Sequence, residues 1–415
     1  MKKIFFSICA LAAVVVGCNK SEMVNAPGRG VEIDFNAYFA KAPLTKAISA
    51  DADYLKTFTS ETTPAFHVNG FLHTEITGSG APAAEGGAAT ILDDDLTTIS
   101  VSNAYMNKNV WWDVDDADPT KGTWDYPGVT YWPDASSGRK LAFSAYGLNA
   151  QTTAPENGTA DIVFEGNSLT QFTYNVPTVV SQQKDLIVTP FLPNQGIEPN
   201  GTISPVQLNF KHLLSRIGFS LISNQDEESI KIDIKKIVLH GTFATSGTVN
   251  LKSVNPVLVT EGAATTASYN FFGEGSTDIC QYSSSDAAQP IYANSTMTAG
   301  ENGSYTVAAK TDGNSDNRFM MIAPTAATPG SYIEVVYQLT EAEEQTARVD
   351  ISTIAFVAGT SYDFVFKVST SAIGFEVTVT PWAEHFTTGD NSTANPTGST
   401  YTLTPYIEDA PAAGV

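Results

Sequence analysis

The sequence predicts an all-β protein built from two tandem β-sandwich domains and a C-terminal extension strand. The chain of 415 residues is 42% hydrophobic and only 16% charged, which is typical of a folded globular protein rather than a disordered one. Short strand patterns separated by turn signals recur along it, whereas helical patterns are few and short. A single sandwich of about 100 residues is too small for this length, so we expect two.

The charge balance excludes one class of partner. The chain carries 44 acidic and 22 basic residues, a formal net charge of −22. A surface this acidic is repelled by phosphate backbones, so nucleic-acid binding is not expected.

The N-terminus has the features of an export signal. Lys2 and Lys3 precede an apolar run from Ile4 to Val16, which fits a signal peptide over residues 1–17 and is too short for a stable membrane anchor. The end of this run, with Gly17 before Cys18, resembles the bacterial lipobox, in which the cysteine is acylated and the chain is cut before it. We therefore expect a covalent lipid such as palmitate on Cys18, tethering the mature protein to a membrane, and no other cofactor. An ordinary secretory signal with a coincidental cysteine is the alternative.

Residues 18–46 contain a tether and one strand. The polar segment 19–30 is typical of a flexible tether. Val31, Ile33 and Phe35 then alternate with polar residues, which predicts a short half-buried strand within 31–39. The chain returns to a loop pattern up to Ala47.

From residue 57 onward, strand patterns and turns alternate. We divide this part into an N-terminal domain, 47–215, and a C-terminal domain, 216–384, because a proline-rich loop at 190–205 precedes a new set of strands. Two short helices are expected, at Asp51–Lys56 and Lys211–Ser215. The predicted strands are Ala65–Ile76, Lys140–Gly147, Thr170–Tyr174, Leu186–Thr189, Ser204–Phe210, Arg216–Ile222, Ser229–Leu239, Ile333–Leu339, Arg348–Phe356, Tyr362–Val368 and Phe375–Val379.

The last segment, 385–415, has a different character. A linker rich in Gly, Ser, Thr and Asn precedes one isolated strand, Thr400–Ile407, which places Tyr401, Leu403 and Ile407 on one face. A strand beyond a linker has no neighbour in sequence to pair with. It must fold back on the body or complete a sheet in another molecule.

Motifs for catalysis or metal binding are missing from the sequence. No zinc-binding histidine or cysteine pattern, nucleophile elbow or phosphate-binding loop occurs, so we expect neither a metal site nor an enzyme. The aspartates between Asp113 and Asp118 lack the glycine and distal glutamate of an EF-hand loop and are interpreted as a solvated loop. Aromatic residues in the same region are interpreted as core packing, with sugar stacking as the alternative; they include Trp111, Trp112, Trp124 and Trp132.

Several phrases along the chain resemble the fimbrillins, the subunits of type V pili of Gram-negative anaerobes. The likeness rests on the order and spacing of short segments that are common in β-sandwich proteins, rather than on one motif. They are the lipobox, Val31–Phe35, Thr45–Ala47, Phe66–Phe71, Tyr131–Pro133, Leu141–Tyr146, Phe210–Arg216, Ala358–Phe364 and Val377–Trp382.

This resemblance implies transthyretin-like, Greek-key sandwiches and a route of assembly. The protein would reach the outer membrane as a lipoprotein, and a trypsin-like protease would cut between Lys46 and Ala47, where the family usually has Arg. Loss of the strand bearing Val31, Ile33 and Phe35 would open an apolar groove. The tail of a neighbouring subunit would fill it, giving a head-to-tail homopolymer in a cell-surface fimbrium that supports adhesion to host or bacterial ligands.

Three alternative roles remain at this point. The chain could be a pilus tip or anchor subunit, although the tail favours a stalk subunit. It could also be a monomeric outer-membrane lipoprotein that binds glycans through the Trp111–Trp132 region.

Overall fold

The computed structural model is built almost entirely of strands in the part of the chain that it describes. No helix there is long and apolar enough to cross a membrane. The predicted signal peptide, Cys18, Lys46 and Ala47 lie outside the described residues. The described residues are 30–38, 55–74, 104–147, 162–164, 168–197, 201, 203–223, 232–260, 265–272, 280–282, 285–291, 296–299, 305–308, 319–339, 342–368, 373–381, 400–403 and 405–407.

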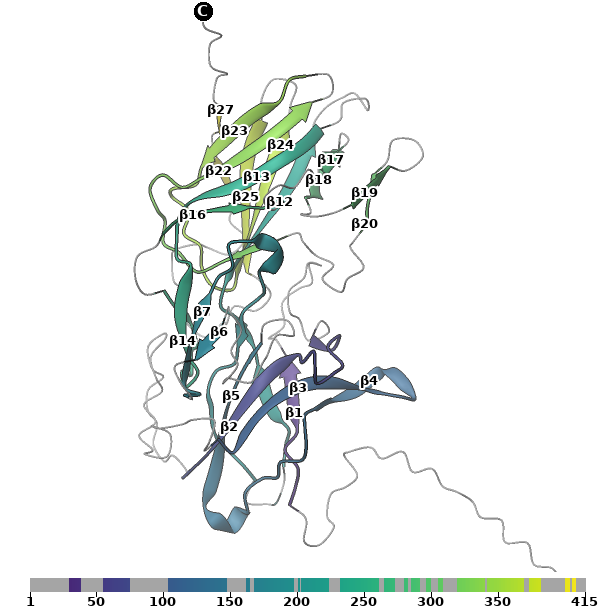
Figure 1. The fold of residues 1–415 in the computed structure, drawn as a ribbon, viewed down its shortest axis with the longest axis vertical. Helices are drawn as coiled ribbons and strands as arrows, with labels where there is room; N and C mark the ends of the chain where they lie inside the picture. Colours follow the sequence, from purple (N-terminus) through teal and green to yellow (C-terminus); the bar gives the residue numbers. More distant parts are fainter. Residues whose placement is uncertain are drawn as a thin grey trace, which may run out of the picture.

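A seven-stranded sheet forms the middle of the N-terminal body (Figure 1). Two of its central strands, β2 and β5, pair antiparallel over most of their length. In spatial order the sheet contains β11 (Lys211–His212), β8 (Ile187–Val188), β5 (Arg139–Gly147), β2 (Phe66–Thr74), β3 (Met106–Asp115) and β4 (Asp118–Asp125), with β9 (Leu192–Gln195) also pairing with β5.

Both faces of this sheet are buried, which makes the N-terminal body a three-layered structure. Leu141 and Phe143 of β5 enter one core cluster, while Ala142 and Tyr146 enter another. The first cluster is covered by a two-stranded sheet, β1 (Phe35–Tyr38) with β10 (Val206–Asn209). The second is covered by a four-stranded sheet of β15 (Leu258–Val259), β14 (Ser246–Asn250), β7 (Gln171–Asn175) and β6 (Ile162–Phe164).

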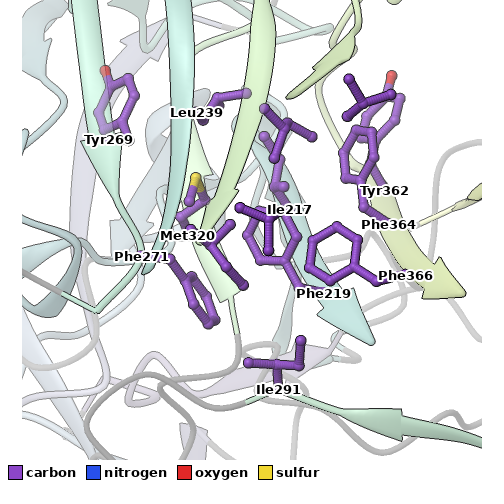
Figure 2. Close-up of a cluster of buried hydrophobic side chains, with 14 of the residues drawn as sticks. Ile217, Phe219, Leu239, Tyr269, Phe271, Ile291, Met320, Tyr362, Phe364 and Phe366 are labelled. Carbon is purple, nitrogen blue, oxygen red and sulfur yellow. The ribbon is translucent and has the colours of Figure 1, made fainter. Parts of the chain in front are cut away.

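The C-terminal body is a sandwich of two six-stranded sheets, as counted over the described strands. Aromatic and aliphatic side chains from both sheets fill its core, where Phe219 packs on Phe271, Phe364 and Phe366 (Figure 2). One sheet contains β18 (Ser285–Pro290), β12 (Ser215–Ser223), β24 (Thr360–Val368), β25 (Ile373–Pro381), β26 (Thr400–Leu403) and β21 (Phe319–Ile322). The other contains β16 (Thr265–Asn270), β13 (Ile232–Phe243), β22 (Tyr332–Leu339), β23 (Gln345–Asp350), β27 (Pro405–Ile407) and β17 (Cys280–Tyr282). A separate hairpin joins β19 (Thr296–Ala299) and β20 (Tyr305–Ala308).

The two bodies are interlocked rather than simply joined end to end. Strand β12 begins at the predicted boundary of 215/216, but β14 and β15 return to the N-terminal body, where β14 pairs with β7 and β15 pairs with β14. Strand β21 has one face in each core: Met320 and Ile322 lie in the C-terminal cluster, and Phe319 and Met321 lie in the second N-terminal cluster. The predicted N-terminal domain, 47–215, therefore lacks residues 246–259, which complete its third layer.

The strands predicted between residues 65 and 379 all overlap observed strands, most with boundaries shifted by a few residues, but Arg348–Phe356 overlaps β23 only over Arg348–Asp350 and is otherwise wrong. The helix predicted at Lys211–Ser215 is wrong. Lys211 and His212 form β11, Ser215 opens β12, and both Leu213 and Leu214 are buried in one core cluster. The apolar pair resembles a helical face locally, but burial between two sheets favours extended backbone instead.

Candidate functional site

The first strand is held by main-chain hydrogen bonds on both of its sides. Its early part bonds to the segment after β4: Ile33 N donates to Thr130 O at 2.9 Å, and Trp132 N donates to Val31 O at 2.8 Å. Its later part, β1, runs parallel to β10, with Phe35 opposite Val206 and Ala37 opposite Leu208. The predicted strand within 31–39 is thus confirmed, and it lies between two pieces of chain that do not pair with each other there.

Side chains of this strand alternate as the sequence predicts. Ile33, Phe35 and Ala37 are buried in the first N-terminal core cluster, whereas Asp34 and Asn36 are exposed. Phe35 makes edge-to-face contacts with the rings of Tyr126 and Phe143, at centroid distances of 5.8 and 5.9 Å. Ala37 was not singled out from the sequence, although it continues the same alternation.

Tyr126 connects the strand to the core through its hydroxyl group. It is buried, and its O–H donates to Ile33 O at 2.8 Å. Burial and, to a lesser degree, the negative charge of Glu32 raise the phenol pKa well above its ordinary value, so the hydroxyl remains protonated. Removing residues 31–38 would take away the nearer of the two acceptors of this hydroxyl, Ile33 O, and would expose the walls formed by Tyr126, Phe143 and the apolar side chains of β10.

The C-terminal tail folds back onto its own C-terminal sandwich. Strand β26 pairs antiparallel with β25, the last strand of one sheet, and β27 pairs antiparallel with β23, the last strand of the other. In the described residues, the strand predicted as Thr400–Ile407 is therefore two short strands on two different sheets. Figure 1 shows β27 beside β23.

The backbone register of the tail pairs its apolar positions with strand positions of both sheets. Tyr401 is opposite Val377 and Leu403 is opposite Phe375, and these in turn pair with the buried residues Phe364 and Phe366. Ile407 is opposite the buried Ala347. Directly paired positions lie on one face of a sheet, so the three positions share their register with buried neighbours, and their role in a donor strand stays a prediction.

A polar cluster lies on the outer face beside β27. The Glu334 carboxylate accepts hydrogen bonds from Arg348 Nε (3.1 Å) and Nη2 (3.0 Å) through one oxygen and from Lys236 Nζ (3.2 Å) through the other. Arg348 lies over the ring of Tyr332 and is the register partner of Tyr406 in β27. Burial alone raises the pKa of the Glu334 carboxyl, but the hydrogen bonds and charges of Arg348 and Lys236 hold it below its ordinary value.

Arg348→Ala is expected to lower the free energy of unfolding by about 1–3 kcal/mol at pH 7, because a nearly buried carboxylate loses the guanidinium group that donates two hydrogen bonds to one of its oxygens. A carboxyl with a lowered pKa stabilises the fold above its ordinary pKa, and this stability is lost as the pH falls through the lowered value. The difference between wild type and variant should therefore shrink below about pH 4.5, as measured by urea unfolding across pH.

The more exposed pair of Lys235 and Glu344, 3.0 Å apart on the same sheet, is the matched control. Lys235→Ala should cost no more than about 1 kcal/mol. A loss for Arg348→Ala no larger than this, or one unchanged by acid, would contradict the assignment.

The aromatic residues in and after the β3–β4 hairpin are mainly structural. Trp124 and Trp132 are buried, which confirms core packing for these two. Trp111 and Trp112 are half-buried, and Trp112 packs edge-to-face on Trp124 at 5.0 Å. Among the described residues, no group of three acidic, histidine or cysteine side chains could hold a metal ion.

His212 belongs to a buried pair and not to a helical turn. Its Nδ1 lies 2.7 Å from Asp185 Oδ2, and both side chains are only 2% exposed. The pair joins the end of β11 to the segment before β8, so it contributes to the packing of the sheet.

Comparison with known proteins places the chain in a family. A family model described as fimbrillin-like matches residues 95–382, which is more than half of the sequence. The chain belongs to the fimbrillin-like family. The matched region of this fimbrillin-like chain runs from just before β3 to the end of β25; the first strand and the tail lie outside it.

Solved structures similar to this fimbrillin-like chain include a fimbrial protein from Bacteroides vulgatus, with 16% identity, coverage of 85% of this chain and 99% of that one, and a TM-score of 0.48. A putative cell adhesion protein from Bacteroides uniformis has 14% identity, coverage of 85% and 98%, and a TM-score of 0.40. The tip fimbrial protein Mfa3 from Porphyromonas gingivalis, with a C-terminal truncation, has 10% identity, coverage of 78% and 97%, and a TM-score of 0.33. No curated protein matched the sequence.

Proposed function

We propose that this protein is a structural, non-enzymatic subunit of a cell-surface pilus that polymerises by strand exchange. Membership in the fimbrillin-like family supports a pilus role. One observation carries the mechanism: a strand over residues 31–38 is held by main-chain bonds along its sides and contributes three buried side chains to the N-terminal core. Among the described residues no element precedes this strand, so its removal cuts through no other described element.

Removal of the strand leaves a groove that needs a replacement. Fully burying a residue such as Ile33 or Phe35 contributes about 1.5–3 kcal/mol, so an empty groove has a strong tendency to bind another apolar strand. The tail of a second copy has alternating apolar residues, Tyr401, Leu403 and Ile407, and lies on two sheet edges from which it can peel away. Main-chain bonds to β10 supply affinity, and alternate side chains supply register.

A head-to-tail contact of this kind does not close on itself and gives a filament. We place the protein first on the outer membrane, through a lipid on Cys18, and then in a cell-surface fimbrium that supports adhesion. A trypsin-like protease would start the process by cutting between Lys46 and Ala47. The glycan-binding alternative has weaker support, because Trp124 and Trp132 are core residues and Trp112 packs on one of them.

Lys46→Ala is expected to block processing and polymer formation in cells. The N-terminal residue of protein sheared from the surface should be Ala47 in wild type, as read by Edman degradation or mass spectrometry. Lys41→Ala, in the same predicted loop, is the control and should be processed normally. Sheared wild-type polymer whose chains still begin at an acylated Cys18 would overturn the proposal.

A further inference from the structure

Pro405 constrains the direction in which a tail can enter the groove. Proline has no N–H, so it fits a strand only where that N–H would point away from the neighbouring strand. In the folded-back tail this condition is met. Ile351 N donates to Ser331 O. Hydrogen-bonding direction alternates along an antiparallel strand, so the N–H and C=O of Val349, two residues earlier, also point towards β22 and away from β27. Pro405 lies opposite Val349 and therefore occupies a non-hydrogen-bonded position.

In the groove, only every second residue of the inserted strand can bond to β10. Val206 N donates to Asp34 O, and Phe210 N donates to Tyr38 O. The exposed, even-numbered residues of the first strand therefore bond to β10, while the backbone of its buried, odd-numbered residues points to the opposite side, as Ile33 N does when it donates to Thr130 O.

Reversing a strand while keeping the same side chains in the core also reverses the side to which their N–H groups point. In a tail that ran antiparallel to β10, the core-face residue Pro405 would press its ring against β10 and leave a β10 carbonyl without a donor. In a tail that ran parallel to β10, the side of Pro405 that lacks an N–H would face away from β10. At the positions of Phe35 and Ala37, the pairing with β10 does not use an N–H on that side. At the position of Ile33, however, a proline would leave Thr130 O without the N–H that Ile33 donates to it.

We propose that the incoming tail runs parallel to β10, in the direction of the strand that it replaces, with Pro405 at the position of Phe35 or Ala37. This inference rests on the proposed strand exchange, with a second copy of the chain as the donor. Pro405 is then a direction-determining residue, because it is compatible with the parallel orientation and with the folded-back tail but not with the reversed one.

Disulfide trapping in polymers of the full-length chain tests the direction. One cysteine replaces the exposed Gln207 or the half-buried Asn209 of β10, and a second replaces Thr402, Thr404, Tyr406 or Glu408 in the tail, in a Cys280→Ser background that is first shown to polymerise. Each bond joins two subunits and gives a covalent ladder in non-reducing gels. In the parallel orientation, the best partner of the cysteine at 209 lies two residues after the best partner of the cysteine at 207.

The opposite order, with the partner of 209 two residues before that of 207, would overturn the proposed direction and leave strand exchange intact. Polymers without a ladder for any pair would overturn strand exchange by this tail, and the direction with it. The role of Pro405 has its own control. Pro405→Thr alone should assemble normally, whereas Thr404→Pro combined with Pro405→Thr, which moves the missing N–H to the β10 side, should lower polymer yield at least tenfold. Normal assembly of the double variant would overturn that role.

Discussion

Phe35→Ala is expected to lower the free energy of unfolding of the unprocessed protein by about 3–5 kcal/mol, the usual cost of removing a buried phenylalanine ring. The ring lies between Tyr126 and Phe143 and is only 4% exposed, so its loss leaves a cavity in the first N-terminal core cluster. Chemical unfolding followed by the fluorescence of the nearby buried tryptophans measures the change.

The same substitution should leave the thermal stability of the assembled polymer unchanged, because under the proposed cut at Lys46 the subunit would begin at Ala47 and would no longer contain residue 35. Asn36→Ala, at the neighbouring exposed position, is the control and should change neither state by more than about 0.5 kcal/mol. A polymer weakened as much as the precursor would mean that the first strand stays in its groove.

Deleting residues 401–415 is expected to abolish polymers while leaving a folded, processed monomer. The monomer loses two edge strands, but both sheets of the C-terminal sandwich retain their central strands and their shared core. Negative-stain electron microscopy and sedimentation of sheared material measure the polymer, and circular dichroism checks the monomer. Polymers that persist without the tail would sink strand donation by this segment.

A point substitution separates the groove contact from the mere presence of a tail. Leu403→Asp places a charge at a core-face position, and burial of an unpaired charge is costly enough to reduce assembly at least tenfold. Thr402→Asp changes the adjacent residue of opposite parity and should assemble normally. Equal effects of the two would contradict the predicted register of the donor.

The strands were predictable because their patterns are local. Alternation of Val31, Ile33 and Phe35 is enough to locate the first strand and its buried face. The third layer was not predictable in this way. His67, Asn69 and His73 of β2 are buried although their polarity suggests a solvent-facing side, because β14 and β15, far along the chain, contribute to the sheet that covers that face.

The functional site shows the same division. The removable strand and the apolar face of the tail follow from periodicity. Their surroundings do not: Tyr126, Phe143 and β10 meet the first strand only through tertiary packing, and Glu334 meets Arg348 and Lys236 across three strands. The division of the tail between two sheets also required the structure, since Pro405 in isolation suggests an end to pairing and not a change of sheet.

The return of β14 to the N-terminal body has a mechanical consequence. A pilus subunit is pulled from its two ends, and a flexible hinge between bodies would stretch first. Here five consecutive residues of β14 pair with β7, and β21 contributes side chains to both cores. Tension is therefore carried across the middle of the subunit by a ladder of backbone bonds. Under the proposed strand exchange, we expect the weakest point under load to lie between subunits, at the exchanged strand, and not within one.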